Sequence, residues 1–298
     1  MNKTTALLVH NAYLDTGKFR EIYALLLSAA ERRGIALTLR RNDELLFDLA
    51  DGHFLDLTER PRFVLFFDKD VLLARRLSAM GIPVFNPPIA IERCDNKALT
   101  HEALAAAGLP QPRTVPAPFT FANIGYTDLD FLSRAEAHLG YPMVIKECFG
   151  SFGEQVHLAH DRTEAAAIIC KISPRPFLMQ EFIAASGGRD VRVNIAGGVA
   201  VSAILRHAKD GDFRSNLTLG GAGEPFPLPE QFRILAERAA AALELSFGGI
   251  DLLFRKDGAP LICEANSNVH FKTTLDICGV NLADCILDDI LKKTAGVK

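Results

Sequence analysis

The stretch Pro260–His270, PLICEANSNVH, begins as an apolar run and then carries Glu264 and Asn266. Residues two apart in a β-strand project from the same face, so these two polar side chains share one side of the strand. The upstream run Phe247–Phe254, FGGIDLLF, has the apolar content of a second strand. Asp257-Gly258 lies between the two runs and is a strong signal for a tight turn. The sequence therefore predicts a β-hairpin.

A two-residue turn at this position fixes which residues of the two strands face each other. The expected pairs are Lys256–Ala259, Leu253–Ile262 and Asp251–Glu264. Two carboxylates directly opposite each other destabilise a sheet unless something neutralises them. Magnesium prefers carboxylate and amide oxygens, so Asp251, Glu264 and Asn266 form a candidate metal site. The alternative is a solvated hairpin end with ordinary surface acids, and the apolar neighbours favour the metal site.

The composition is that of a globular chain. It has 298 residues, of which 49% are hydrophobic and 23% charged, with a net charge of -3. This length allows roughly two or three lobes, and the charge argues against a nucleic-acid or anionic-membrane partner. The six cysteines form no CxxC pair, which is typical of reduced thiols in the cytosol. No segment has the apolar length of a signal peptide or a membrane span, so we expect a cytoplasmic protein.

Strand and helix signals alternate over the first part of the chain. Apolar runs and amphipathic segments follow one another at 5–10, 20–34, 35–40, 62–67, 70–80 and 82–86. This alternation predicts a doubly wound parallel α/β sheet. A single helix is expected over 90–108, and the proline-rich stretch 109–118 is expected to be an extended connector. The last third is rich in strands.

A lysine and a glycine-rich segment follow the buried strand MVIK. Lys146 ends that strand, and glycines within Gly150–Gly153 let the backbone approach an anion closely. The segment lacks the pattern of a Walker A loop and that of a nucleophile elbow. Charged residues farther along suit a metal-bridged polyphosphate, with a surface salt-bridge lattice as the alternative. These residues are Asp190, Arg192, Arg206, Arg214 and Asn216.

These motifs, in this order, resemble the ATP-grasp superfamily and, more closely, the RimK-type ligases that add glutamate. The motifs are CDNK, MVIKECFGSFGEQV, MQEFI, GGRDVRVNIAGG, GDFRSN with GGAGEP, and GIDLLF followed by LICEANSN. The resemblance covers nearly the whole chain. It implies an α/β ATP-grasp fold, with two α+β subdomains gripping ATP, preceded by a small doubly wound parallel domain. The expected boundaries are 1–92 for this domain, 93–186 for the lid and central subdomain, and 187–298 for the C-terminal catalytic subdomain.

The resemblance also implies a role for each matching residue. Asp251, Glu264 and Asn266 would hold Mg²⁺, or Mn²⁺ in its place, which agrees with the hairpin argument. Arg206 would be the catalytic residue that steadies the transferring phosphoryl group. The residues implied to bind ATP are Lys97, Lys146, Gly150, Ser151 and Gly153 at the phosphates, Gln180, Glu181, Phe182 and Ile183 at the adenine, Asp190 at the ribose, and Arg214, Ser215 and Asn216 in the RSN motif.

The implied reaction joins an amine to a carboxylate. ATP would phosphorylate the carboxylate, and an amine, usually that of glutamate or a similar amino acid, would attack the acyl phosphate to give an amide, ADP and phosphate. The family usually continues NSSPG after the metal strand, whereas this chain reads NSNVHFKTT. His270 and Lys272 replace the usual turn near the carboxylate-donor site. Together with Arg192, they are the candidates for binding an anionic substrate.

Two alternatives to this function stay open. The same machinery would serve a different amino acid or a natural-product peptide. A nucleotide-binding regulator without turnover is an alternative from a different functional class. It is disfavoured because every charged position expected of an active enzyme carries the expected residue. The expected partners are a small-molecule amino acid and a carboxylate or peptide, without nucleic acid or membrane. The resemblance also implies self-association into a homo-oligomer.

Overall fold

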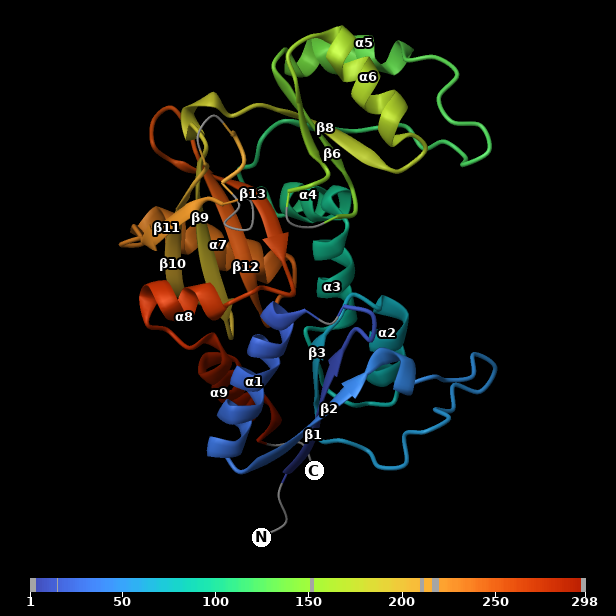
Figure 1. Ribbon diagram of the computed structural model, residues 1–298, viewed down its shortest axis with the longest axis vertical. Coiled ribbons are helices and arrows are strands. Elements are labelled where there is room, and N and C mark those ends of the chain that lie inside the picture. The colour runs from blue at the N-terminus through green and yellow to red at the C-terminus, as the bar shows by residue number, and fades with distance from the viewer. Residues whose placement is uncertain (1–3, 15, 151–152, 210–211, 216–219, 296–298) are drawn as a thin grey trace.

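The structure is a computed structural model that describes residues 4–14, 16–150, 153–209, 212–215 and 220–295. It contains three β-sheets, one after another along the chain (Figure 1). The N-terminal sheet lies at the bottom of the view, the largest sheet lies above it, and the lid sheet lies at the top. None of the helices in these ranges combines the length and the apolar character that crossing a bilayer requires.

The N-terminal sheet is parallel and has the strand order β2-β1-β3-β4. Helices α1 (Gly17–Arg32) and α2 (Val71–Ala79) pack on its opposite faces. The chain passes from β1 to β2 on one side and then crosses to β3 on the other, so the winding direction reverses between β1 and β3. Ligands of such sheets bind at the carboxyl ends of the strands at this reversal. The strands are β1 (Thr4–His10), β2 (Ile35–Arg41), β3 (Val64–Phe67) and β4 (Val84–Phe85), with a short 3₁₀ turn η1 (Asn42–Glu44) after β2.

The prediction of one helix over 90–108 is wrong, because Asn96 interrupts it. Two helices form instead, α3 (Pro88–Asp95) and α4 (Lys97–Ala106). Asn96 has extended backbone angles, and its side-chain oxygen accepts a hydrogen bond from the amide of Ala98 (3.0 Å). Asparagine is among the best N-cap residues, so the sequence CDNK favours a new helix start here. The consequence is that Lys97 occupies the first position of α4.

The lid sheet is antiparallel, with the order β5-β8-β6-β7, and two helices pack on one of its faces. The side chains of Met143, Ile145, Phe177 and Met179 face those helices. Strand alternation then turns Lys146 toward the opposite face, away from the helices. The elements are β5 (Thr114–Pro116), α5 (Asp130–Leu139), β6 (Met143–Glu147), β7 (Val156–Ala159), α6 (Arg162–Ile172) and β8 (Phe177–Glu181), followed by the 3₁₀ turn η2 (Ala184–Ser186).

The largest sheet is antiparallel, with the order β11-β10-β9-β12-β13. Helix α7 covers one face of this sheet through an apolar core. The sequence patterns do not predict β11, which reads AGEP, or the seven-residue α8, because neither has a clear periodicity. The elements are β9 (Arg189–Ala196), β10 (Val199–His207), β11 (Ala222–Pro225), α7 (Glu230–Ala242), β12 (Phe247–Phe254), β13 (Pro260–Asn266), α8 (Lys272–Cys278) and α9 (Leu282–Thr294).

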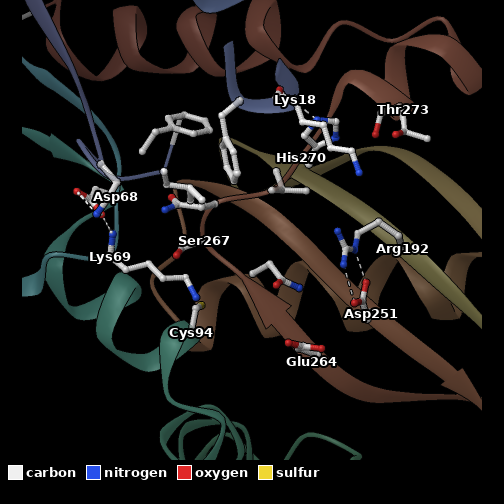
Figure 2. Close-up of a pocket in the computed structure, with 18 of the residues that line it drawn as sticks. Lys18, Asp68, Lys69, Cys94, Arg192, Asp251, Glu264, Ser267, His270 and Thr273 are labelled. Atoms are coloured by element: carbon white, nitrogen blue, oxygen red, sulfur yellow. Dashed lines mark hydrogen bonds and ion pairs between the residues drawn. The ribbon is translucent and has the colours of Figure 1, made fainter. Parts of the chain in front are cut away.

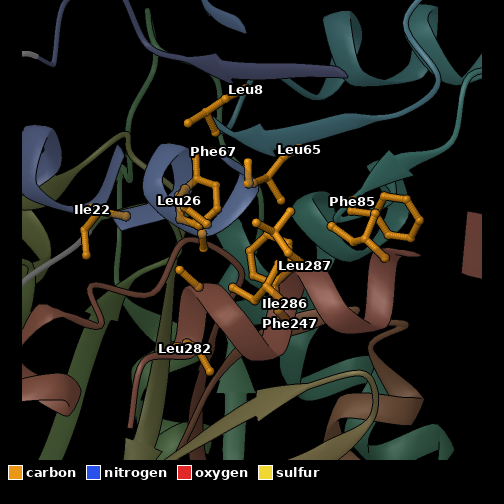
Figure 3. Packing of buried hydrophobic residues seen from close by; sticks show 14 of the residues in the cluster. Leu8, Ile22, Leu26, Leu65, Phe67, Phe85, Phe247, Leu282, Ile286 and Leu287 are labelled. Carbon is orange, nitrogen blue, oxygen red and sulfur yellow. The ribbon is translucent and has the colours of Figure 1, made fainter. Parts of the chain in front are cut away.

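The N-terminal sheet and the largest sheet meet around a cavity, whose lining is drawn in Figure 2. Beneath it, the two units share one apolar core (Figure 3). Leu65 and Phe67 of β3 pack there with Phe247 of β12 and with Ile286 and Leu287 of α9. The rings of Phe67 and Phe247 are stacked, with centroids 5.2 Å apart. Burying such side chains stabilises the junction by about 1.5–3 kcal/mol each, so this core fixes the two walls of the cavity.

Asn86 joins the same two units by hydrogen bonds. Its side chain is fully buried, and its Nδ2 donates to the carbonyl oxygens of Phe247 (2.9 Å) and Ser267 (3.0 Å). Its Oδ1 accepts from the amides of Ser246 (2.8 Å) and Phe247 (3.1 Å). One amide group thus satisfies four backbone groups at the start of β12 and the end of β13.

We expect Asn86→Ala to lower the free energy of unfolding by about 3 kcal/mol, because each buried polar group left without a partner costs about 1–3 kcal/mol. Urea unfolding followed by circular dichroism would measure the change. The matched control is Asn281→Ala, which removes the N-cap bond to the amide of Ala283 in α9 together with a part-buried bond from Nδ2 to Asp284 (2.8 Å), and should cost about 1 kcal/mol. Equal losses in the two variants would contradict the joining role of Asn86.

Candidate active site

The loop between β12 and β13 differs from the predicted two-residue turn. It contains three residues, 256–258, and is closed by a bond from the amide of Arg255 to the carbonyl oxygen of Ala259 (2.8 Å). Gly258 ends the loop with a φ of +81°, the left-handed conformation that a three-residue hairpin loop requires. The extra loop residue shifts the register near the turn by one. The predicted pairs Lys256–Ala259 and Leu253–Ile262 are therefore wrong.

A β-bulge then restores the predicted register at the acidic residues. Leu252 pairs with Ile262, whereas Asp251 pairs with Glu264, so Cys263 is the extra residue. A bulge redirects the side chains next to it. Here the thiol of Cys263 lies 3.6 Å from Nζ of Lys146. The prediction that Asp251 and Glu264 face each other is confirmed, and the bulge adds a thiol beside them.

Two arginines neutralise the charge of Asp251. From the sequence alone, a metal ion was expected to neutralise it. On the neighbouring strand β9, Arg192 forms a bidentate pair with Asp251, with Nη2 at 2.7 Å from Oδ2. Arg206 of β10 donates to both oxygens of Asp190 (2.6 and 2.5 Å) and also lies 3.0 Å from Asp251. The four side chains thus form an alternating row of charges across β9, β10 and β12.

Asp190, Arg206 and Asp251 of this row are buried, and the pKa values of Asp251 and Arg206 are shifted by their neighbours. Burial acts to raise the pKa of Asp251, but Arg192 and Arg206 outweigh it and hold that pKa at about 2. Burial acts to lower the pKa of Arg206, and Asp190 and Asp251 raise it instead. Asp251 is therefore ionised and the guanidinium of Arg206 is charged throughout the physiological pH range.

Two buried lysines lie close to the hairpin, Lys97 near Glu264 and Lys146 near Cys263. Lys97 is 8% exposed and Lys146 is 6% exposed. Nζ of Lys97 lies 3.6 Å from Oε1 of Glu264 and donates to the carbonyl oxygen of Gly150 (3.1 Å). Gly150 has a φ of +145°, and a Cβ added there would lie 2.5 Å from the side chain of Gln155. The structure thus brings both predicted phosphate lysines and the start of the glycine-rich segment to one place; Ser151 is outside the described residues.

The predicted adenine-binding segment, residues 180–183, begins with the last two residues of β8, and the side chains of these two residues already have partners. Nε2 of Gln180 donates to Thr114 (2.9 Å) and to the ring of His101 (3.1 Å). Burial lowers the pKa of His101 to about 4, so its neutral ring accepts that bond. The carboxylate of Glu181 accepts bonds from Nε (2.7 Å) and the amide of Arg113. The backbone of this segment, rather than these two side chains, is thus the candidate for contacting a base.

The RSN motif lies against the glycine-rich segment. Nη1 of Arg214 donates to the carbonyl oxygen of Gly153 (2.9 Å), while its Nη2 pairs with Asp212 (2.8 Å). Ser215 is buried, and Asn216 is outside the described residues. The ring of Phe213 also packs edge-on against that of Phe182, so the loop joins the glycine-rich segment to the β8 end. The residues of this loop thus contact both Gly153 and Phe182.

The cavity has a volume of about 470 Å³ and receives side chains from both units (Figure 2). The largest sheet contributes Arg206, Asp251, Glu264 and Asn266 to the lining, and Figure 2 shows Asp68 and Lys69 of the N-terminal unit on the other side from Asp251 and Glu264. Sequence reasoning missed this second group. The signal was present for Asn11, Asp68 and Lys69, because these residues directly follow the strands β1 and β3, where ligands of parallel sheets bind, whereas Lys18 lies in the first turn of α1. The main polar residues of this group are Asn11, Lys18, Asp68 and Lys69.

The three predicted substrate-binding residues have different surroundings. Arg192 lines the cavity but uses its guanidinium on Asp251. His270 also lines the cavity, and its Nε2 lies 3.2 Å from the carbonyl oxygen of Lys18. Burial lowers the pKa of His270. Lys272 is not among the lining residues and pairs with Asp276 one turn along α8.

Side-chain oxygen atoms at the hairpin are suitable ligands for a magnesium ion. The described residues contain no group of three histidine, cysteine, aspartate or glutamate side chains placed to hold a metal. The candidate ligands are instead the side chains of Asp251, Glu264 and Asn266, which all line the cavity; a metal would share the Asp251 carboxylate with Arg192 and Arg206, which pair with it in this structure. Nδ2 of Asn266 is buried without a hydrogen-bond partner, so the protein alone does not fully satisfy this amide group. Mg²⁺ takes few protein ligands together with substrate phosphates, which suits this set.

Comparison with known proteins identifies the family. Residues 94–290 match the sequence profile of the RimK-like ATP-grasp domain. The chain belongs to this family. The match contains the buried lysines, the row of charges and the hairpin acids, and the family resemblance inferred from the motifs is confirmed.

Two similar curated proteins, both synthases, are longer than this chain. A β-citrylglutamate synthase B from Danio rerio is 37% identical over 225 residues, covering 75% of this chain and 54% of the relative. A human N-acetylaspartylglutamate synthase A is 36% identical, covering 74% of this chain and 55% of the relative. The chain thus spans about half the length of these relatives.

The solved structures support the fold over almost the entire chain. An ATP-grasp RimK domain protein from Sphaerobacter thermophilus superposes with a TM-score of 0.70. The alignment covers 96% of this chain and 98% of that protein, at 24% identity. At this identity the likeness concerns the fold alone. The predicted ATP-grasp fold class is confirmed, while the boundaries at residues 92 and 186 stay predictions.

Proposed function

We propose that this protein is an ATP- and Mg²⁺-dependent ligase that joins a carboxylate to an amine through an acyl phosphate and releases ADP and phosphate. The observation that carries the proposal is the convergence of Lys97, Lys146 and Glu264 beside a cavity lined by Asp251 and Asn266. Phosphoryl transfer needs charge neutralisation and positioning rather than a protein nucleophile. The site offers cations for phosphates and oxygen ligands for a metal, as this chemistry requires.

Each part of the chain has a distinct task in the proposed reaction. Lys97 and Lys146 bind phosphate oxygens of ATP, and the glycine-rich segment with Arg214 closes over them. Arg206 faces the reacting phosphoryl group from its pair with Asp190. The lid excludes water, which protects the acyl phosphate from hydrolysis. Asp251, Glu264 and Asn266 would hold Mg²⁺, which would supply charge neutralisation at the phosphates.

Glutamate is the amine substrate that we propose first. The two curated relatives are named as synthases of β-citrylglutamate and N-acetylaspartylglutamate, both of which contain glutamate. The cavity volume of about 470 Å³ suits a small carboxylate or a short peptide. A different amino acid is the second candidate, which the altered NVHFK segment after the metal strand favours.

Phosphate release by the purified protein with ATP and Mg²⁺ tests this function. The twenty amino acids should be supplied singly, in pairs, and with citrate, N-acetyl-L-aspartate or short acidic peptides, and masses taken of active mixtures. Release that depends on glutamate, with a product heavier by one glutamyl unit, is the expected result. Release with other substrates keeps the ligase and changes the amino acid. Nucleotide binding with no release from any mixture contradicts the ligase function.

We expect His270→Ala and Lys272→Ala to differ in their effect on the KM for the carboxylate substrate. His270 lines the cavity, so its loss should raise the KM for the carboxylate substrate by about tenfold, the effect of one polar contact. Lys272 pairs with Asp276 outside the lining, so its loss should change that KM by less than about twofold. Steady-state kinetics at saturating ATP provide the measurement. A larger effect of Lys272→Ala would place the substrate on α8 instead.

A further inference from the structure

A buried carboxylate lines the cavity on the side of the N-terminal sheet. Asp68 directly follows β3, is 5% exposed, and lines the cavity. Its Oδ1 accepts bonds from the amide of Lys69 (2.6 Å) and from Nδ2 of Asn11 (3.1 Å), which follows β1. Its Oδ2 has only the longer contact with Asn11 (3.4 Å). This oxygen therefore retains most of its capacity to accept hydrogen bonds.

No lysine or arginine side chain pairs with this carboxylate in the part of the chain that the structure describes. Nζ of Lys69 pairs with Asp95, and the polar contacts of Asp68 are those with Asn11 and the Lys69 amide. A buried charge without a counter-ion costs stability, and burial accordingly raises the pKa of Asp68. Such an arrangement is retained where a ligand supplies the missing positive charge.

The position in the fold points to the same conclusion. Asn11 and Asp68 lie at the carboxyl ends of β1 and β3, where the winding of the parallel sheet reverses. That crevice is where ligands of such sheets bind. Asn11 is held in place because its Oδ1 accepts a bond from the amide of Tyr13 (3.0 Å). Its Nδ2 is thereby directed at Asp68 rather than free to rotate.

We infer that Asp68 and Asn11 form a subsite for a protonated amine on the carboxylate substrate. The inference rests on the proposed ligase function and specifies its substrate. Figure 2 shows Asp68 on the opposite side of the cavity from Asp251 and Glu264. The ammonium group held by Asp68 is therefore not the amine that attacks the acyl phosphate. The substrate class is an amino acid or short peptide whose amino group is remote from the carboxylate that is activated.

Matched pairs of probes test this subsite by isothermal titration calorimetry on the full chain, with and without Mg²⁺ and a non-hydrolysable ATP analogue. The pairs are L-glutamate with N-acetyl-L-glutamate, and L-alanyl-L-glutamate with its N-acetyl form. We expect wild type to bind the free amine of at least one pair about tenfold more tightly, as for a hydrogen bond to a charged group. We expect Asp68→Asn to remove this preference and to leave the affinity for the acetylated probe unchanged.

Two results would overturn the subsite. One is equal affinity of wild type for the two members of both pairs, including the case where none of the probes binds. The other is a preference that persists in Asp68→Asn. Asp56→Asn, which changes an exposed acid of the same domain, is the matched control and should keep the preference. Because binding is measured without turnover, phosphate release reports separately on the ligase function, and either can fail alone.

Discussion

Glu264→Gln should lower kcat by at least about a hundredfold while leaving the protein folded, because the change removes a charge that a bound metal and phosphates require. Glu264 faces Asp251 across the hairpin and lies 3.6 Å from Lys97, at the edge of the cavity. Glutamine keeps the shape and one oxygen of the side chain. The loss should therefore appear in turnover, and raising the Mg²⁺ concentration should recover part of it.

Stability distinguishes this prediction from a loss of structure. Glu264 is directly opposite another carboxylate, an arrangement that destabilises a sheet, so its neutralisation removes a repulsion. The partly exposed pair with Lys97 is lost at the same time, which costs about 0–1 kcal/mol. We expect the free energy of unfolding to change by less than about 1 kcal/mol. Full activity in Glu264→Gln, or a loss equal to that of the exposed control Glu59→Gln, would contradict the metal assignment.

The hairpin shows how far sequence reasoning extends at this site. The opposition of Asp251 and Glu264 followed from the two apolar runs and the turn signal, and it is confirmed. The predicted two-residue turn is not what produces this pairing. A three-residue loop shifts the register by one residue, and a bulge at Cys263 shifts it back. The bulge has no sequence signal of its own. The contact of its thiol with Lys146 could therefore be found only in the structure.

Contacts between distant segments account for the rest of what the sequence did not predict. Arg192 and Asp251 are 59 residues apart, and their pairing depends on the order of strands in the sheet. Asn11 and Asp68 are 57 residues apart and meet the hairpin only because two units share one apolar core. The break at Asn96, in contrast, is local. The preference of asparagine for the N-cap position could be recognised in the sequence CDNK. The new helix start then places Lys97 at the site.

Arg206→Ala should lower the free energy of unfolding by about 3–5 kcal/mol, the usual cost of removing one partner of a buried ion pair. Asp251 keeps Arg192 in this variant, whereas Asp190 loses the guanidinium that holds both its oxygens. Without a cation, Asp190 becomes a buried charge with no counter-ion, which accounts for the expected loss. Urea unfolding followed by circular dichroism measures this loss.

The paired replacements decide whether Arg206 serves stability alone or also catalysis. Arg206→Ala with Asp190→Ala removes both charges, so it should recover much of the stability lost in Arg206→Ala. If Arg206 also faces the phosphoryl group, kcat should stay low in this double variant although the protein is stable again. Arg206→Lys keeps the charge without the two-pronged geometry and should give intermediate values of both. Recovery of kcat in step with stability would assign Arg206 to the ion-pair row only, and the phosphoryl group would then depend on Lys97 and Lys146.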